Sequence, residues 1–270
     1  MPYAILLNEI KEFDLQKAAG ILAKAQNIVY ADATFRFRNA TGVLITNMLR
    51  EEAEMITNEL NGAGIGCFFM DMSEFYNPPA PYTTHGAHLS DDSFGIIDVY
   101  GRTQPFSWPN IVLISCGRIA EKKVKRSASE TSSHSIGLGV LPISPISRGI
   151  RNLKSRLDQK SSEKIEKTSW WYLDLFSKQP QEKHIRIEGN GFNYDCLRDN
   201  KQPGSNENFK ILLTQICGYA TVAYSNRGVQ NLLAAESKET SYRSRKHFDD
   251  ENFWLLQLTY LNLKNNQQGA

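Results

Sequence analysis

The sequence has few of the residues that build disulfide scaffolds, metal centres and membrane spans. It contains 4 cysteines and 5 histidines in 270 residues, and Cys67, Cys116, Cys196 and Cys217 lie far apart without a C-x-x-C pair. This usage argues against a disulfide framework or zinc site and suits an intracellular chain with reduced thiols. No apolar run approaches the roughly 18 residues that cross a bilayer, and the start MPYAILLNEIKEF has no secretory pattern. We therefore expect a soluble, cytoplasmic protein.

Strong charge and catalytic signatures are also missing. The formal net charge is only +2, which argues against a nucleic-acid-binding character for the chain as a whole. The serines gather in one polar stretch rather than in a G-x-S-x-G elbow, and most acidic residues stand at expected helix starts, where capping explains them. The sequence therefore predicts no enzyme, no catalytic residue and no cofactor.

Residues 1–72 alternate between strand and helix patterns. Short apolar runs at 3–7, 42–45 and 65–70 have the length of strands. Asp14 is placed to cap a helix with apolar residues at helical spacing, and 30–39 is interpreted as a second short helix. We expect a βα(α)βαβ module with its helices on one face of a three-stranded sheet. Its third helix is expected to be capped by Thr46 or Asn47 and to bury Leu49, Ala53, Ile56 and Leu60.

The glycine-rich segment GAGIG, residues 62–66, has two interpretations. A dinucleotide-binding loop follows a strand and opens a helix, so that the helix N-terminus meets the pyrophosphate. This segment instead follows a helix and opens a strand. We therefore interpret Gly62 and Gly64 as the end of the helix, where a residue with positive φ is usual.

The pattern REEAEMITNELNGAGIGCFFM, after a strand–helix–helix–strand beginning, resembles the C-terminal domain of the bacterial ribosomal stalk protein. The N-degron protease adaptor shares that fold. The resemblance implies a fold and a habit of binding proteins. The family's Gly- and Lys-rich second helix is replaced here by NIVYADATFRFRN, and its dimerising arm is absent, so no ribosomal role is implied.

Residues 73–92 are polar and contain Pro78, Pro79 and Pro81, which favour extended backbone and predict a linker. The linker holds His85 and His88, with two aspartates just beyond. Such an H-x-x-H pair is either a weak metal site or, as is more usual in polar loops, a solvated pair.

From residue 93 the pattern changes to period two. We expect an antiparallel β roll over 93–225, with a hairpin turning at 101–103, strands at 111–115, 171–176 and 184–188, and a closing helix over 206–220. The order of WPNIVLI, LDLF and HIRIE before a helix resembles bacterial pleckstrin-homology-like domains. C-terminal helices are expected over 226–270, the last one starting at the acids 249–251. The fold class expected for the chain is α+β.

The stretches WPNIVLISCGRI, LDLF…HIRIEGNGFNYDCL and NENFKILL also resemble uncharacterised bacterial proteins of the same two-part layout. This resemblance implies no activity.

A polar and basic insertion at 120–169 interrupts the roll. It is interpreted as a solvated segment, as a partner-binding segment, or as a contact for anionic lipid or nucleic acid. Under the second interpretation, an apolar anchor is flanked by cations. The candidate partner-binding residues are Val140, Leu141, Ile143, Ile146, Arg148, Arg151 and Lys154.

Together these patterns favour a non-catalytic protein–protein interaction or assembly protein, such as a scaffold, adaptor or complex subunit. The expected contact surfaces are the helix at 49–60, the insertion and the final helix, and a homo-oligomer is compatible with them. The alternative is an accessory or sensor subunit that binds a small ligand or metal near His85 and His88. A third and less favoured interpretation is a peripheral membrane or nucleic-acid binder through the basic insertion. Aromatics are not interleaved with its cations, which argues against binding of single-stranded nucleic acid.

Overall fold

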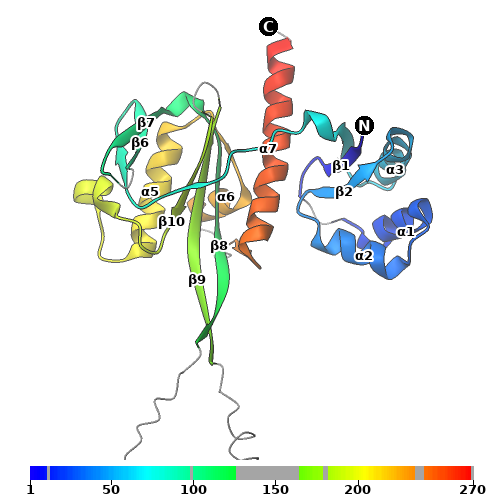
Figure 1. Cartoon of the computed structure of the whole chain (residues 1–270), viewed down its shortest axis with the longest axis horizontal. Coiled ribbons are helices and arrows are strands. Elements are labelled where there is room, and N and C mark those ends of the chain that lie inside the picture. Colours follow the sequence, from blue (N-terminus) through cyan, green and yellow to red (C-terminus); the bar gives the residue numbers. More distant parts are fainter. Residues whose placement is uncertain (11–12, 98–99, 126–163, 179–181, 235–239, 269–270) are drawn as a thin grey trace, which may run out of the picture. The chain divides into compact units, whose positions relative to one another are not determined.

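The structure is a computed structural model that describes residues 1–10, 13–97, 100–125, 164–178, 182–234 and 240–268 (Figure 1). The described residues within 1–120 and 170–270 form one compact unit. This unit contains helices together with antiparallel and mixed sheets, so the expected α+β class is confirmed.

The N-terminal part contains six elements in the order strand, helix, helix, strand, helix, strand. Strand β1 is the centre of a three-stranded sheet with order β2-β1-β3 and pairs antiparallel with both neighbours. Buried apolar side chains from the sheet and all three helices form one core. The elements are β1 (Tyr3–Leu7), α1 (Leu15–Gln26), α2 (Tyr30–Asn39), β2 (Val43–Met48), α3 (Arg50–Gly62) and β3 (Cys67–Asp71).

The glycine segment ends α3, as interpreted from the sequence. Gly64 has φ +83°, a conformation that glycine adopts without the steric cost of a Cβ. The Gly64 N–H donates to the carbonyl of Asn61 (3.0 Å), and the Ile65 N–H donates to the carbonyl of Leu60 (2.9 Å). These two bonds are the Schellman pattern of a helix C-terminus, so the interpretation as a terminator is confirmed.

The helix caps were predicted with mixed success. Asp14 caps α1, because its carboxylate accepts from the backbone N–H groups of residues 16 and 17. The predicted cap of α3 was wrong: β2 continues to Met48, Asn47 takes φ +61°, and Leu49 is the N-cap. Leu49 is therefore in extended conformation and 70% exposed, not part of the buried face. The other predicted inward residues of α3 are fully buried.

The remaining strands form two sheets. One has the order β11-β8-β9-β10-β4, with β12 also paired to β8; the other is β5-β6-β7. The predicted hairpin is present as β6 and β7, which pair antiparallel with Phe94 opposite Phe106. The strands are β4 (Tyr82–Thr84), β5 (Ala87–Leu89), β6 (Ser93–Ile97), β7 (Thr103–Ser107), β8 (Ile111–Lys125), β9 (Lys164–Ser177), β10 (Lys183–Glu188), β11 (Tyr224–Ser225) and β12 (Ser241–Tyr242).

The expected linker at 73–92 differs from the structure in its second half. Strand β4 pairs parallel with β10, with Tyr82 opposite Ile185, and β5 pairs antiparallel with β6. Short polar strands of three residues carry too weak a periodicity to be recognised in a sequence. Two three-residue strands of the sheets, Tyr82–Thr84 and Ala87–Leu89, therefore lie within the expected linker.

Among the described residues, three 3-10 helices and three further α-helices complete the fold. The last helix begins at Arg245, four residues before the acids that were expected to open it. The elements are η1 (Met72–Glu74), η2 (Trp108–Asn110), η3 (Tyr194–Asn200), α5 (Ser205–Tyr219), α6 (Arg227–Leu233) and α7 (Arg245–Gln268).

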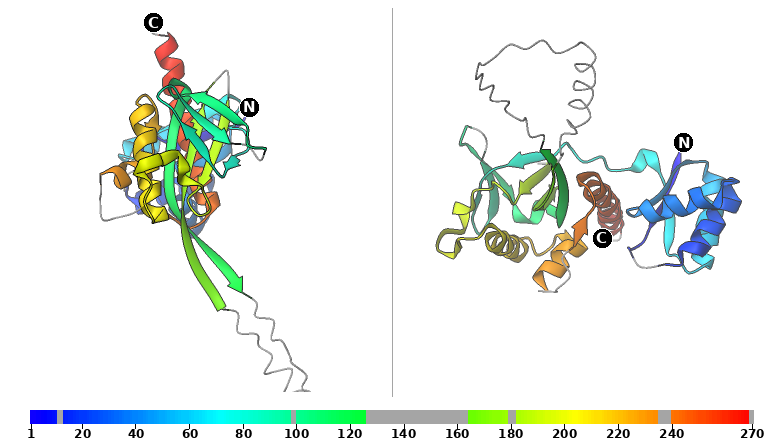
Figure 2. Two further views of the ribbon diagram at one scale, coloured as in Figure 1. Left: turned by 90° about the vertical axis from the view of Figure 1, so that its left-hand side faces the viewer. Right: turned by 90° about the horizontal axis from the view of Figure 1, so that it is seen from below.

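Helix α7, which carries the C-terminal end of the chain in Figures 1 and 2, contributes to two cores at once. Trp254 is buried in the N-terminal core, and its indole N–H donates to the carbonyl of Leu7 on β1 (2.8 Å). Leu256 packs in a separate cluster with Val112 of β8 and Phe176 of β9. The broad apolar band of the final helix is thus docked within its own chain.

Candidate functional site

The residues proposed from the sequence do not come together in a described site. Val140, Leu141, Ile143, Ile146, Arg148, Arg151 and Lys154 lie outside the described residues. His85 and His88 are both exposed, and the carbonyl oxygen of His85 accepts the Asn193 N–H (2.8 Å). In the part of the chain that the structure describes, no cluster of three or more His, Cys, Asp or Glu residues is placed to hold a metal ion.

All four cysteines are free thiols. Burial raises the pKa of Cys67, Cys196 and Cys217 to about 11 each, and it raises the pKa of Cys116 well above its ordinary value. Thiolates are the nucleophilic form of cysteine, and these groups remain thiols near neutral pH. The cysteines therefore serve as small apolar core residues.

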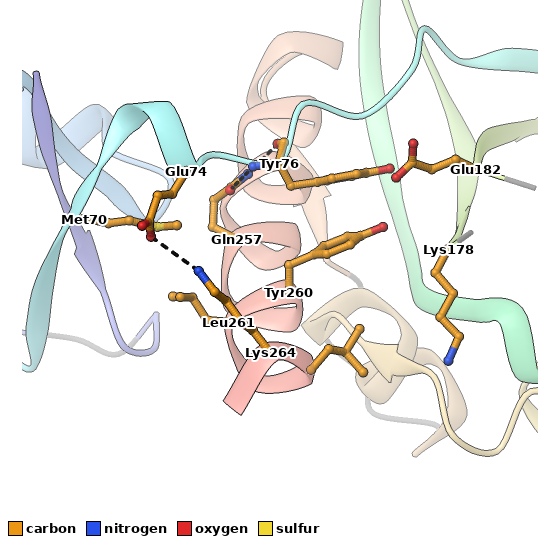
Figure 3. Close-up of a pocket in the computed structure, with 10 residues that line it drawn as sticks. Met70, Glu74, Tyr76, Lys178, Glu182, Gln257, Tyr260, Leu261 and Lys264 are labelled. Carbon is orange, nitrogen blue, oxygen red and sulfur yellow. Dashed lines mark hydrogen bonds and ion pairs between the residues drawn. The ribbon is translucent and has the colours of Figure 1, made fainter. Parts of the chain in front are cut away.

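A cavity of about 600 Å³, which we call the tyrosine pocket, lies beside the second half of α7 (Figure 3). Its walls come from β3 and η1, from the segment after η1, from α7 and from the segment between β9 and β10. The lining residues are Met70, Glu74, Tyr76, Lys178, Glu182, Gln257, Tyr260, Leu261, Leu263 and Lys264.

Two stacked tyrosines form the aromatic wall of this pocket (Figure 3). The rings of Tyr76 and Tyr260 have centroids 3.9 Å apart and an interplanar angle of 17°. Gln257, one turn before Tyr260 on α7, holds the backbone of Tyr76. The Gln257 side-chain oxygen accepts the Tyr76 N–H, and the Gln257 side-chain nitrogen donates to the Tyr76 carbonyl, both at 2.9 Å. The pair is therefore held by an amide clamp from the same helix.

The phenol groups stay protonated near neutral pH. Burial first, and then the neighbouring Tyr260 hydroxyl and the Glu182 carboxylate, raise the pKa of Tyr76. Burial also raises the pKa of Tyr260. The Tyr260 hydroxyl oxygen is buried and makes no hydrogen bond of normal geometry within the described residues. The neighbouring Tyr76 hydroxyl interacts with it, and the described residues do not use the rest of its hydrogen-bonding capacity.

Charged side chains at the pocket are balanced in sign. The Lys264 amine lies 3.9 Å from the Glu74 carboxylate, and both side chains are more than half exposed, so the pair belongs to the mouth (Figure 3). Lys178 and Glu182 supply one charge of each sign from the other wall. A pocket with apolar walls and a few placed polar groups binds and orients a ligand. The raised phenol pKa values keep both O–H groups present as donors and leave little phenolate to act as a base.

A second polar feature, which we call the Asp174 cluster, is fully buried. The Asp174 carboxylate accepts two hydrogen bonds from Arg186 (2.8 and 2.6 Å), one from Asn252 (3.0 Å), and pairs with His184 Nε2 at 2.8 Å. Ser115 contacts the side chain of Asn252. Burial alone would raise the pKa of Asp174, but the hydrogen bonds from Arg186 and His184 outweigh burial and hold that pKa below its ordinary value.

The cluster joins four elements, because its members come from β8, β9, β10 and α7. Arg186 is 2% exposed and also bonds Asp249, near the start of α7. A buried ion pair with all its partners in place fixes one arrangement of the elements that carry it. We interpret the Asp174 cluster as a polar lock that sets the position of α7 on the sheet.

Sequence reasoning missed the tyrosine pocket. Tyr76 lies in the segment that was expected to be a linker, and Tyr260 lies in the apolar band of a helix, where an aromatic residue is usually core. Only the fold brings the two rings together. The breadth of the apolar band was the one signal available, and it pointed to docking rather than to a cavity.

Comparison with known protein families, with curated proteins and with solved structures finds no match for this chain. The resemblances to the stalk-protein domain and to pleckstrin-homology-like domains therefore stay predictions. No helix among the described residues is both long enough and apolar enough to cross a membrane.

Proposed function

We propose that this chain is a non-catalytic binding protein whose tyrosine pocket receives an apolar group that carries a hydrogen-bond acceptor. The observation that carries the proposal is a cavity of about 600 Å³ whose lining includes Tyr260, with a buried hydroxyl that makes no hydrogen bond of normal geometry with the residues that the structure describes. Leaving such a group unsatisfied costs about 1–3 kcal/mol. An acceptor on the ligand removes this cost, and the apolar walls add about 25 cal/mol for each Å² of apolar surface that they bury.

Two kinds of ligand could supply an apolar group with a hydrogen-bond acceptor. The first is a side chain of a partner protein, which matches the scaffold or adaptor function favoured by the sequence. Exposed apolar side chains on the N-terminal part support this source, because Val29, Phe35 and Leu49 are 68%, 69% and 70% exposed. The second source is a free small molecule, which would make the protein an accessory or sensor subunit. Four reduced thiols support placing either function in the cytoplasm.

One experiment separates the two sources. A photo-crosslinking amino acid at Lys264, at the mouth of the pocket, is irradiated in cells that express the full chain, with and without Tyr260→Phe. A protein source gives a discrete crosslinked band that Tyr260→Phe removes. A small-molecule source gives no such band, and native mass spectrometry of the purified chain then shows an added mass that Tyr260→Phe removes.

The matched control is Tyr30→Phe, which removes the same hydroxyl from an exposed position on α2. We expect this variant to keep the band or the added mass. If neither signal appears, or if both tyrosine variants behave alike, the tyrosine pocket is not the binding site and the proposal is wrong.

A further inference from the structure

A second cavity, of about 410 Å³, shares no lining residue with the tyrosine pocket. We call it the Arg198 hollow. It is lined mainly by polar and charged side chains from β5, from the turn between β5 and β6, from η3 and from α5. The residues on which the inference rests are His88, Asp91, Arg198, Asp199, Gln215 and Tyr219.

One wall of the hollow is fixed by aromatic packing. The Tyr219 ring stacks on Trp108, with centroids 5.0 Å apart and an interplanar angle of 13°. The Tyr219 hydroxyl donates to the Asp91 carboxylate (3.3 Å), and the Trp108 indole N–H donates to the carbonyl of Ser90 (2.9 Å). The turn that carries Asp91 is therefore held in place before any ligand arrives.

The backbone at Arg198 is strained. Its φ of 51° and ψ of −125° interrupt η3, and residues with a side chain rarely adopt this conformation. Glycine would fit the turn at lower cost. Leu197 beside it is buried, and the Arg198 carbonyl accepts the Lys201 N–H (3.1 Å), so the surrounding structure holds the strained residue. Backbone strain of this kind clusters at active sites and ligand-binding sites.

The charges of the hollow have both signs. The Arg198 guanidinium forms no ion pair with the residues that the structure describes, while Asp91 and Asp199 supply two carboxylates. The side chains of His88 and Gln215 add further hydrogen-bonding groups. A simple anion would be repelled by the two carboxylates, and a simple cation would be repelled by the guanidinium. A small zwitterion matches both.

We propose that the Arg198 hollow binds a free α-amino acid, with the ligand carboxylate on Arg198 and the ligand ammonium on Asp91 and Asp199. A planar guanidinium is the side chain best suited to a carboxylate, which it binds through two parallel N–H donors. This site is independent of the tyrosine pocket, so either proposal can fail without the other.

The test is thermal-shift and calorimetric titration of the full chain with each common L-amino acid, and with acetate and methylammonium as half-ligands. We expect at least one amino acid to raise the thermal midpoint and to bind saturably, while neither half-ligand does. Arg198→Gly should weaken the binding of that amino acid roughly tenfold or more, as expected for the loss of a charge-assisted pair. The same variant should keep or raise the thermal midpoint without ligand, because glycine relieves the strain.

Asp91→Asn tests the contact with the ligand ammonium group and should weaken binding of the amino acid by a comparable factor. Lys210→Gln, on the exposed side of α5, is the control that changes a charge outside the hollow and should bind as the wild type does. The proposal is overturned if no amino acid binds, if acetate binds as well as the amino acid, or if Arg198→Gly leaves the affinity unchanged.

Discussion

Removal of the buried Asp174 carboxylate should strongly destabilise the fold. Arg186 is 2% exposed, and in Asp174→Ala it would keep Asp249 as its one anionic partner among the described residues. His184 and Asn252 would each lose an acceptor. Breaking a buried ion pair while one charge stays buried costs about 3–5 kcal/mol. We expect a loss of this size in the free energy of unfolding, measured by urea titration with tryptophan fluorescence and far-ultraviolet circular dichroism.

The control for this prediction is Asp195→Ala. Asp195 also forms an ion pair, with Lys201 at 2.7 Å, but its side chain is 70% exposed. Surface pairs contribute about 0–1 kcal/mol, so this variant should unfold almost as the wild type does. A loss below about 1 kcal/mol in Asp174→Ala, or equal losses in the two variants, would refute the interpretation of the Asp174 cluster as the lock for α7.

Three further outcomes follow from the same structure. Because the pKa of Asp174 is lowered in the folded state, its contribution is present above the ordinary carboxyl pKa of 3.8 and is lost as the pH falls below it. Acid titration of stability should therefore be shallower in Asp174→Asn than in the wild type. Gly42→Ala should destabilise by about 2 kcal/mol or more, since Gly42 has φ +97° and an added Cβ would lie 2.1 Å from the Trp254 ring. The control for this change is Gly20→Ala, within α1 and without a heavy atom in reach of the added Cβ, which should instead stabilise by about 0.5–1 kcal/mol. Alkylation of the four cysteines should be slow at pH 8 in the native chain and fast in urea, because burial raises their pKa values; equal rates would contradict this.

Local signals in the sequence were sufficient for the elements of the N-terminal part. Apolar spacing, the Asp14 cap and the glycine terminator each act within a few residues, and the structure contains a helix or strand wherever those signals stand. The failed cap of α3 has a local cause as well. Asn47 takes a left-handed conformation at the end of β2, and this moves the start of the helix past the two polar residues that were expected to cap it.

The non-local arrangement could not be derived in the same way. The parallel pairing of β4 with β10 joins Tyr82 to Ile185, and nothing in either segment specifies the other. Helix α7 packs its apolar residues into two different cores, and the tyrosine pocket exists only because α7 is docked in this way. Residues that become neighbours only through tertiary packing leave no spacing rule in the sequence.

Binding at the tyrosine pocket is tested most directly by titrating the full chain with 8-anilinonaphthalene-1-sulfonate and following its fluorescence. This probe combines an aromatic body with a sulfonate acceptor, the chemistry that the stacked tyrosines and the Tyr260 hydroxyl are placed to receive. We expect saturable binding that Tyr260→Phe weakens about two- to tenfold, as for the loss of one hydrogen bond, and that Tyr30→Phe leaves unchanged. Equal affinities for the wild type and Tyr260→Phe would contradict the assignment of this pocket as the binding site.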